Sequence, residues 1–102
     1  MDMEKLAIEF EEEMLRIHRE AKKACPDFKG GSRFLGMINQ HGGVDTAKRL
    51  LEDPGKVHDG FADLVVFHKR PDLTSEHLVL IDRFQPLFDE RERDEAKRRL
   101  GR

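Results

Sequence analysis

The sequence contains no tryptophan and no tyrosine, so its large aromatic side chains are seven phenylalanines. A phenylalanine ring carries no polar group, and we therefore expect these rings to form a hydrophobic core. The single cysteine, Cys25, excludes an internal disulfide and favours a reducing compartment. The longest apolar runs, LVVF and LVLI, are too short to cross a bilayer, and the acidic N-terminal stretch is unlike a secretory signal. We expect a cytoplasmic protein that does not bind membranes.

The chain also lacks a large net charge, because 19 lysines and arginines nearly balance 21 acidic residues, for a net charge of −2. This balance provides no overall field that would attract nucleic acid or an anionic membrane. Binding to nucleic acid would need a local basic patch. Lys69, Arg70 and the bases at the C-terminus are the candidates for such a patch.

The size and the composition predict one folded domain over residues 1–102. A chain of 102 residues and 11.9 kDa buries roughly 60 to 70 per cent of its unfolded surface, which suffices for one modest core. Charged residues make up 39% of the chain and hydrophobic residues 37%. These fractions, with mixed signs of charge, are typical of a polar globular domain and not of a disordered chain.

One long amphipathic helix is predicted from Asp2 to Ala24, since this stretch contains no glycine or proline. Its apolar residues recur alternately four and three positions apart: Met3, Ala7, Phe10, Met14, Ile17, Ala21 and Ala24. Glutamates dominate its first half and lysines its end, an order that complements the helix dipole. Cys25 and Pro26 end this helix.

Ile8 and Leu15, seven residues apart, form a second apolar stripe beside the core face of this helix. They either widen the core face or form an interaction surface for a partner, such as a helix of a second copy.

Two short helices joined by two glycines are predicted next. The first runs from Arg33 to His41 with Ser32 as its N-cap, and the second follows Gly43 and is ended by Asp53, Pro54 and Gly55. Gly42 can adopt the left-handed conformation that closes a helix, and Gly43 allows the chain to turn immediately.

Three further helices complete the predicted fold. Residues 57–70, with Gly60 at a turn and Phe61 in the core, fit a helix better than a strand, although Val65 to Phe67 would also suit a strand. Leu73 precedes Thr74, which is predicted to cap a fifth helix that runs to Pro86. A last helix from Asp89 to about Leu100, expected at the surface, has a capping box with Glu92 and is closed by Gly101.

These elements predict an all-α fold, a compact bundle of five or six helices in which a long N-terminal helix is followed by short ones. Leu78, Ile81 and Phe84 are expected to face inward from the fifth helix.

The sequence offers no pattern of catalytic or metal-binding residues. Its five histidines show none of the spacings that place two ligands on one helix face. His41 is the most suggestive, and we interpret it as a structural residue at the end of a helix. We therefore expect neither a metal nor another cofactor, and no enzymatic activity.

The helix pair over residues 33–52 also resembles a helix-turn-helix, which makes a nucleic-acid-binding accessory protein the alternative function. Its second helix would present Asp45, Thr46, Lys48 and Arg49, and phosphate contacts would come from Lys69, Arg70, Lys97, Arg98, Arg99 and Arg102. The acidic Asp45 and the isoelectric point near 6.2 argue against this alternative.

Four segments in order, FLGMINQHGGVDTAKRLL, DGFADL, LTSEHLVL and the stretch from Phe84 to Leu100, resemble a widespread uncharacterised bacterial domain. The resemblance implies a bacterial origin, a small helical module and an accessory role, and it brings no activity. It supports Gly42, Gly43, Gly60, Phe61, Leu73 and Thr74 as framework positions. The preferred function is thus a non-enzymatic protein-interaction module that works through Ile8 and Leu15.

Overall fold

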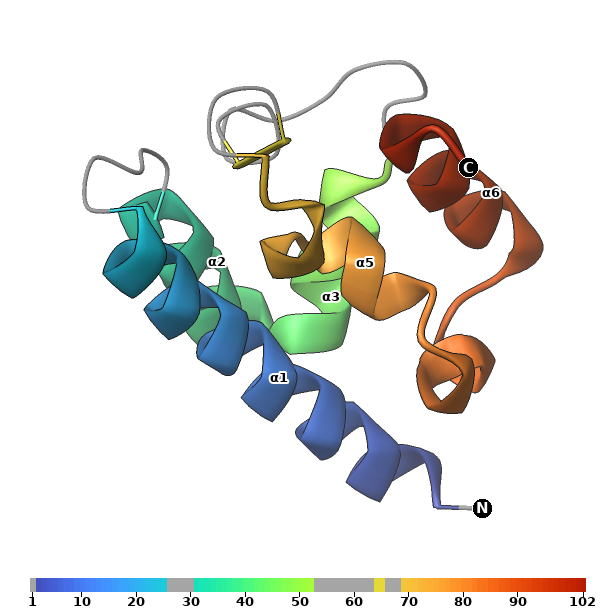
Figure 1. Cartoon of the computed structure of the whole chain (residues 1–102). Helices are drawn as coiled ribbons and strands as arrows, with labels where there is room; N and C mark the ends of the chain where they lie inside the picture. The colour runs from blue at the N-terminus through green and yellow to red at the C-terminus, as the bar shows by residue number, and fades with distance from the viewer. Residues whose placement is uncertain (1, 26–30, 53–63, 66–68) are drawn as a thin grey trace.

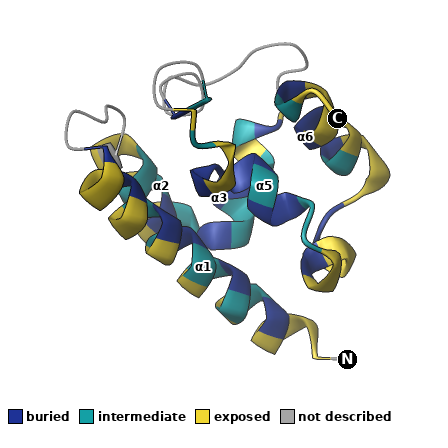
Figure 2. Cartoon of the chain, viewed as in Figure 1, coloured by how far each residue is buried: buried dark blue, intermediate teal, exposed yellow. Residues whose placement is uncertain are grey.

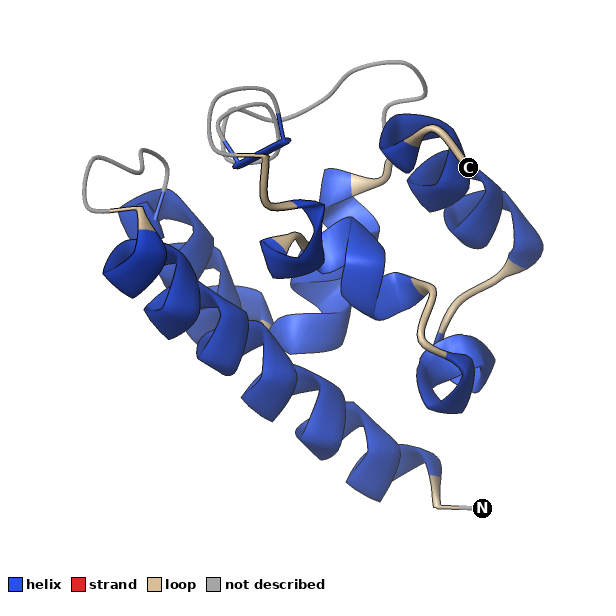
Figure 3. Cartoon of the chain, viewed as in Figure 1, coloured by secondary structure: helices blue, strands red, loops and turns tan. Residues whose placement is uncertain are grey.

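One long helix lies along one side of the molecule, and the shorter helices pack against it. The computed structural model describes residues 2–25, 31–52, 64–65 and 69–102, and α1 (Met3–Ala24) lies along one side of the other helices (Figure 1). The others are α2 (Gly31–His41), α3 (Gly43–Leu50), η2 (Pro71–Leu73), α5 (Ser75–Val79), η3 (Asp82–Leu87) and α6 (Glu90–Leu100). Within the described ranges there is no strand, as Figure 3 shows. The predicted all-α fold is confirmed.

The predicted first helix is present, but its buried face differs slightly from the prediction. Asp2 caps it, since its Oδ1 accepts hydrogen bonds from the backbone N–H groups of Glu4 (3.1 Å) and Lys5 (3.3 Å). The residues that it buries are Leu6, Phe10, Met14, Ile17 and Ala21. Met3, predicted in the core, is 46% exposed, because the first turn of α1 extends beyond the helices that cover its middle (Figure 1). Ala24, at the other end, is exposed too.

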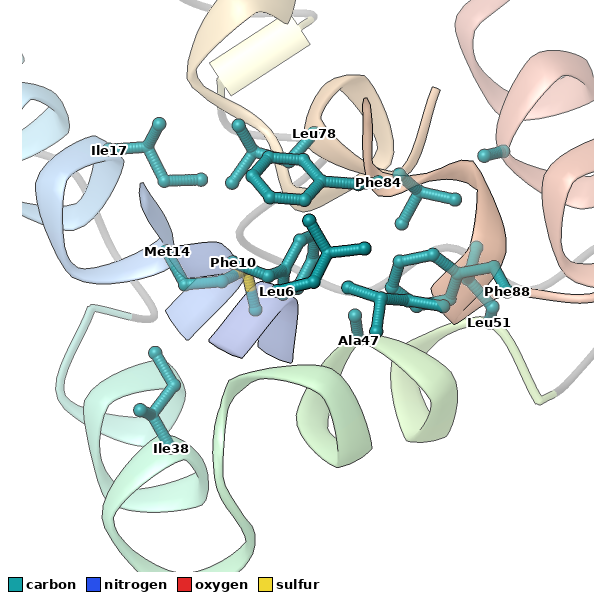
Figure 4. Close-up of a cluster of buried hydrophobic side chains, with 13 residues drawn as sticks. Leu6, Phe10, Met14, Ile17, Ile38, Ala47, Leu51, Leu78, Phe84 and Phe88 are labelled. Atoms are coloured by element: carbon teal, nitrogen blue, oxygen red, sulfur yellow. The ribbon is translucent and has the colours of Figure 1, made fainter. Parts of the chain in front are cut away.

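Phe10 lies at the centre of the main hydrophobic core (Figure 4). Its ring contacts those of Phe84 and Phe88 edge to face, with centroids 5.1 Å apart in both pairs. Around these rings the core contains Leu6, Met14, Ile17, Ile38, Ala47, Leu51, Leu78, Val79, Leu87 and Ala96. The members of this core come from α1, α2, α3, α5, η3 and α6, and from Leu51 and Phe88 beside these helices.

The glycine corner between α2 and α3 differs from the prediction in its details. Gly42 has a positive φ of 86°, as expected, but its ψ of 165° is extended, and it precedes α3 as the N-cap residue. Its N–H donates to the carbonyl of Ile38 (2.8 Å) and so completes the last turn of α2. Ser32 is not the N-cap of α2, because this helix begins one residue earlier, at Gly31.

The predicted fifth helix is wrong in its length. It divides into α5 and η3, and Ile81 between them has an extended backbone (ψ 129°). Pro86 lies inside η3, where it has no N–H to donate to the Asp82 carbonyl, so the segment after Ile81 lacks an α-helical hydrogen bond. The break at Ile81 places Phe84 and Leu87 in the core from a 3-10 helix.

Most of the helix predicted over residues 57–70 lies outside the described residues, including Gly60 and Phe61. Leu64 and Val65 form part of a π-helical turn. The buried Leu64 packs with Ala21, Cys25 and Leu73 in a second, smaller hydrophobic cluster.

Candidate functional site

The side of α1 that faces away from the other helices is largely exposed (Figure 2). Ile8 is 57% exposed, and together with Met3 it is one of the two large exposed hydrophobic residues in the described part of the chain. Leu15, two turns later on the same stripe, is half-buried and packs against the main core. Each of the two sequence-based alternatives therefore applies to one residue. Leu15 widens the core face, whereas Ile8 is exposed and available to a partner.

Charged residues continue this stripe in both directions along α1. We call Glu4, Ile8, Glu12, Leu15, Arg19 and Lys22 the outer stripe; these residues are spaced four, four, three, four and three positions apart, which keeps them on one face. Its four charged residues are all exposed. The acids precede the bases along the helix, so the two halves of the outer stripe have opposite charge.

The N-terminus of α3 could in principle bind an anion, but a residue of α1 already occupies it. Glu11 Oε1 accepts a hydrogen bond from the Gly43 N–H at 2.8 Å. A negative charge at this position is favoured by the helix dipole. The two helices are also very close, since a Cβ on Gly43 would lie 2.7 Å from the Cα of Glu11. The glycine corner thus anchors α3 on α1.

His41 lies at this corner beside Asp45. The distance from His41 Nδ1 to Asp45 Oδ2 is 3.7 Å, and the same oxygen accepts a hydrogen bond from Arg49 Nε at 2.8 Å. This bond is the main reason why the pKa of Asp45 is below its usual value. Among the described residues, no three histidine, cysteine, aspartate or glutamate side chains are close enough to hold a metal ion.

Thr74 and Leu73 hold the start of α5. The Thr74 hydroxyl oxygen accepts from the His77 N–H (3.2 Å), and its O–H donates to the Pro71 carbonyl (2.7 Å). Leu73 is buried in the smaller hydrophobic cluster. Both therefore connect η2 and α5 to the core.

A buried ion-pair network, which the sequence did not indicate, joins α6 to α5 and α3. Arg99 and Glu76 have fully buried side chains, and their Nη1 and Oε2 atoms are 3.0 Å apart. Arg99 also donates to Glu95 Oε2 (2.7 Å) and to the backbone carbonyl of Leu50 (2.7 Å). Arg99 is therefore not the surface phosphate contact that the nucleic-acid alternative requires.

Other bases named by that alternative are also paired with carboxylates. Lys48 donates to Glu92 (2.8 Å), and the remaining pairs are Arg49 with Asp45, Arg70 with Asp72, and Arg98 with Glu95. Thr46 is completely buried and cannot reach a nucleic acid. The helix pair α2–α3 is therefore present, but much of its predicted binding surface is used within the protein.

His18 on α1 stacks on Phe34 of α2, with ring centroids 6.1 Å apart and planes 16° from parallel. Its Nδ1 is buried without a hydrogen-bond partner among the described residues. Burial lowers the pKa of His18 below its usual 6.5, and the positive charges of Lys22 and Arg19 lower it further. The neutral ring is thus part of the contact between α1 and α2.

Comparison of the chain with protein-family models, with curated proteins and with solved structures finds no match in any of the three. None of the described helices combines the length and the apolar composition that crossing a bilayer requires.

Proposed function

We propose that the protein is a non-enzymatic protein-interaction module, an accessory domain of the bacterial cytoplasm that binds a protein partner through the outer stripe of α1. The observation that carries the proposal is the exposure of Ile8, 57%, on the outer stripe, whose other exposed residues are charged. An apolar residue with a charged surround is a common centre of a protein interface.

The structural roles of three carboxylates support the non-enzymatic part of this proposal. Glu11 holds the N-terminus of α3, Glu92 closes the capping box of α6 with Asp89, and Glu76 pairs with Arg99. These carboxylates stabilise helices and helix contacts. The bacterial origin and the cytoplasmic location rest on the sequence resemblance and on the single cysteine, which is free and buried.

The proposal is tested by affinity capture from a lysate of bacteria that also express a second, differently tagged copy of this chain. The captured chains are the wild type, Ile8→Glu and the control Gln40→Glu, and bound proteins are measured by quantitative mass spectrometry. Ile8→Glu is expected to lose the captured partner, while Gln40→Glu, at an exposed position of α2, retains it. Leu15 is left unchanged, because it packs against the core and a charged residue there would disturb the fold. Identical capture by all three chains would contradict the proposal.

Nucleic-acid binding through α2 and α3 is the second candidate. The two helices joined at Gly42 support it, while the pairing of Lys48 and Arg49 with carboxylates and the burial of Thr46 weigh against it.

A further inference from the structure

We infer that the partner of the outer stripe is a second copy of this chain, whose α1 packs antiparallel against the first. The inference deepens the proposed function and rests on it, since it names the partner of the same surface. Three features of the outer stripe support it: the order of its charges, the spacing of its residues and the position of its two apolar side chains.

The order of charges favours an antiparallel pair. The first half of the outer stripe contains Glu4 and Glu12, and the second half contains Arg19 and Lys22; all four are exposed. An antiparallel second copy places the acidic half of each helix opposite the basic half of the other. A parallel copy would place like charges opposite each other, which is destabilising. The two ends of the outer stripe are therefore complementary to each other under a two-fold rotation.

The spacing of the residues makes the apolar and the charged contacts compatible. Ile8 follows Glu4 by four residues, and Arg19 follows Leu15 by four residues. Glu4 lies about 6 Å from Ile8 along the helix axis, and Arg19 lies about 6 Å from Leu15. In an antiparallel pair with Ile8 of one copy against Leu15 of the other, these two displacements point in the same direction. The two residues then lie opposite each other. The two-fold symmetry repeats both contacts, so one register makes two apolar contacts and two ion pairs.

The same register places Glu12 of each copy near the two-fold axis, where the two carboxylates approach each other. This like-charge contact opposes association. The interface is also small, since Ile8 contributes most of its accessible apolar surface and Leu15 is half-buried. We therefore expect a reversible dimer that forms at protein concentrations on the order of 0.1 mM and weakens with added salt.

Sedimentation equilibrium of the full chain tests this inference, with two charge-reversal variants. Glu4→Lys gives the outer stripe a basic residue at both ends of the contact, and Arg19→Glu gives it an acidic residue at both ends. Each variant alone is expected to be monomeric. An equimolar mixture of the two restores both ion pairs and is expected to form a heterodimer.

Further variants serve as controls in the same experiment. Lys97→Glu, an exposed residue on α6, reverses a charge away from the outer stripe and should leave the dimer intact. Glu12→Gln should strengthen association at low salt, because it removes the repulsion at the axis. Circular dichroism of every variant verifies that the helical fold is retained.

A wild-type chain that remains monomeric up to about 1 mM, or a mixture that does not associate, would overturn the inference. The affinity capture separates this failure from failure of the proposed function. If Ile8→Glu loses a captured protein while the wild-type chain is monomeric, the interaction module stands and its partner is a different protein. If the wild-type chain is monomeric and capture does not depend on Ile8, both the inference and the proposed function fail.

Discussion

The carboxylate of Glu11 in α1 accepts a 2.8 Å hydrogen bond from the backbone N–H of Gly43, the first residue of α3. The bond joins residues 32 positions apart in the sequence and lies where the two helices come very close together. One glutamate thus satisfies an open N–H group at the start of α3 and brings a negative charge to the positive end of the helix dipole. This contact holds the glycine corner against the long helix.

Gly43→Ala is predicted to lower the free energy of unfolding by about 1–3 kcal/mol, because the new Cβ would lie 2.7 Å from the Cα of Glu11 and would push α3 away from α1. The matched control is Gly36→Ala in α2, where a new Cβ meets no atom within 4 Å. Alanine has a higher helix propensity than glycine, so Gly36→Ala should stabilise the protein by about 0.5–1 kcal/mol. Urea unfolding followed by circular dichroism measures both changes, and an equal effect of the two substitutions would show that the helices are not in close contact here.

Arg99→Met is predicted to lower the free energy of unfolding by about 3–5 kcal/mol, since it leaves the buried carboxylate of Glu76 without the guanidinium that faces it. Arg98→Met is the control. Arg98 pairs with Glu95, as Arg99 does, but its side chain is 52% exposed, so the loss of this pair should cost less than about 1 kcal/mol. Thermal and urea unfolding of the two variants provide the comparison. If both variants were equally stable, the buried network would not be holding α6 in place.

Lowering the pH through 6.5 is predicted to destabilise the protein through His18. The pKa of His18 is below 6.5 in the folded protein, so between this pKa and 6.5 the unfolded chain binds the proton more readily. The free energy of unfolding is therefore unaffected by protonation of His18 above about pH 6.5, and it decreases as the pH falls from 6.5 towards the pKa of His18 in the folded protein. Titration of the His18 ring signals by NMR measures the pKa directly.

His18→Gln provides the control for this pH effect. The variant should show a smaller loss of stability between about pH 7.5 and pH 5 than the wild-type chain. A pKa at or above 6.5, or an unchanged pH dependence in the variant, would contradict the prediction.

The protein is predicted not to retard duplex DNA or RNA in a gel shift at low salt, where phosphate contacts are strongest. Lys48, Arg49, Arg70 and Arg98 each face a carboxylate of the protein itself. Retardation that disappears at higher salt and after Arg49→Ala would instead support the nucleic-acid alternative.

The sequence predicted the elements that depend on local signals. The spacing of Phe10, Met14 and Ile17 indicated the core face of α1, and the cap of α6 formed as the pair of Asp89 and Glu92 predicted. These features depend on residues within one or two helical turns of each other, so the sequence order alone contains the information.

Contacts between distant residues could not be predicted in the same way. Arg99 lies among other bases in a very polar helix, a pattern typical of an exposed face, and its partner Glu76 is 23 residues away. Burial of this pair depends on where α5 and α6 meet in space. The candidate site was only partly predictable for the same reason, because the stripe of Ile8 and Leu15 was visible in the sequence but the packing that covers Leu15 and leaves Ile8 exposed was not.

Site-specific photo-crosslinking in bacterial cells tests most directly whether the outer stripe of α1 is the binding surface. A photoreactive amino acid replaces Ile8 in one chain and, as the control, Gln40 on the exposed side of α2 in another. The proposed function predicts a specific crosslinked protein, either a second copy or another partner, from position 8 and none from position 40. Crosslinks of equal intensity from both positions, or crosslinks from position 40 alone, would contradict it.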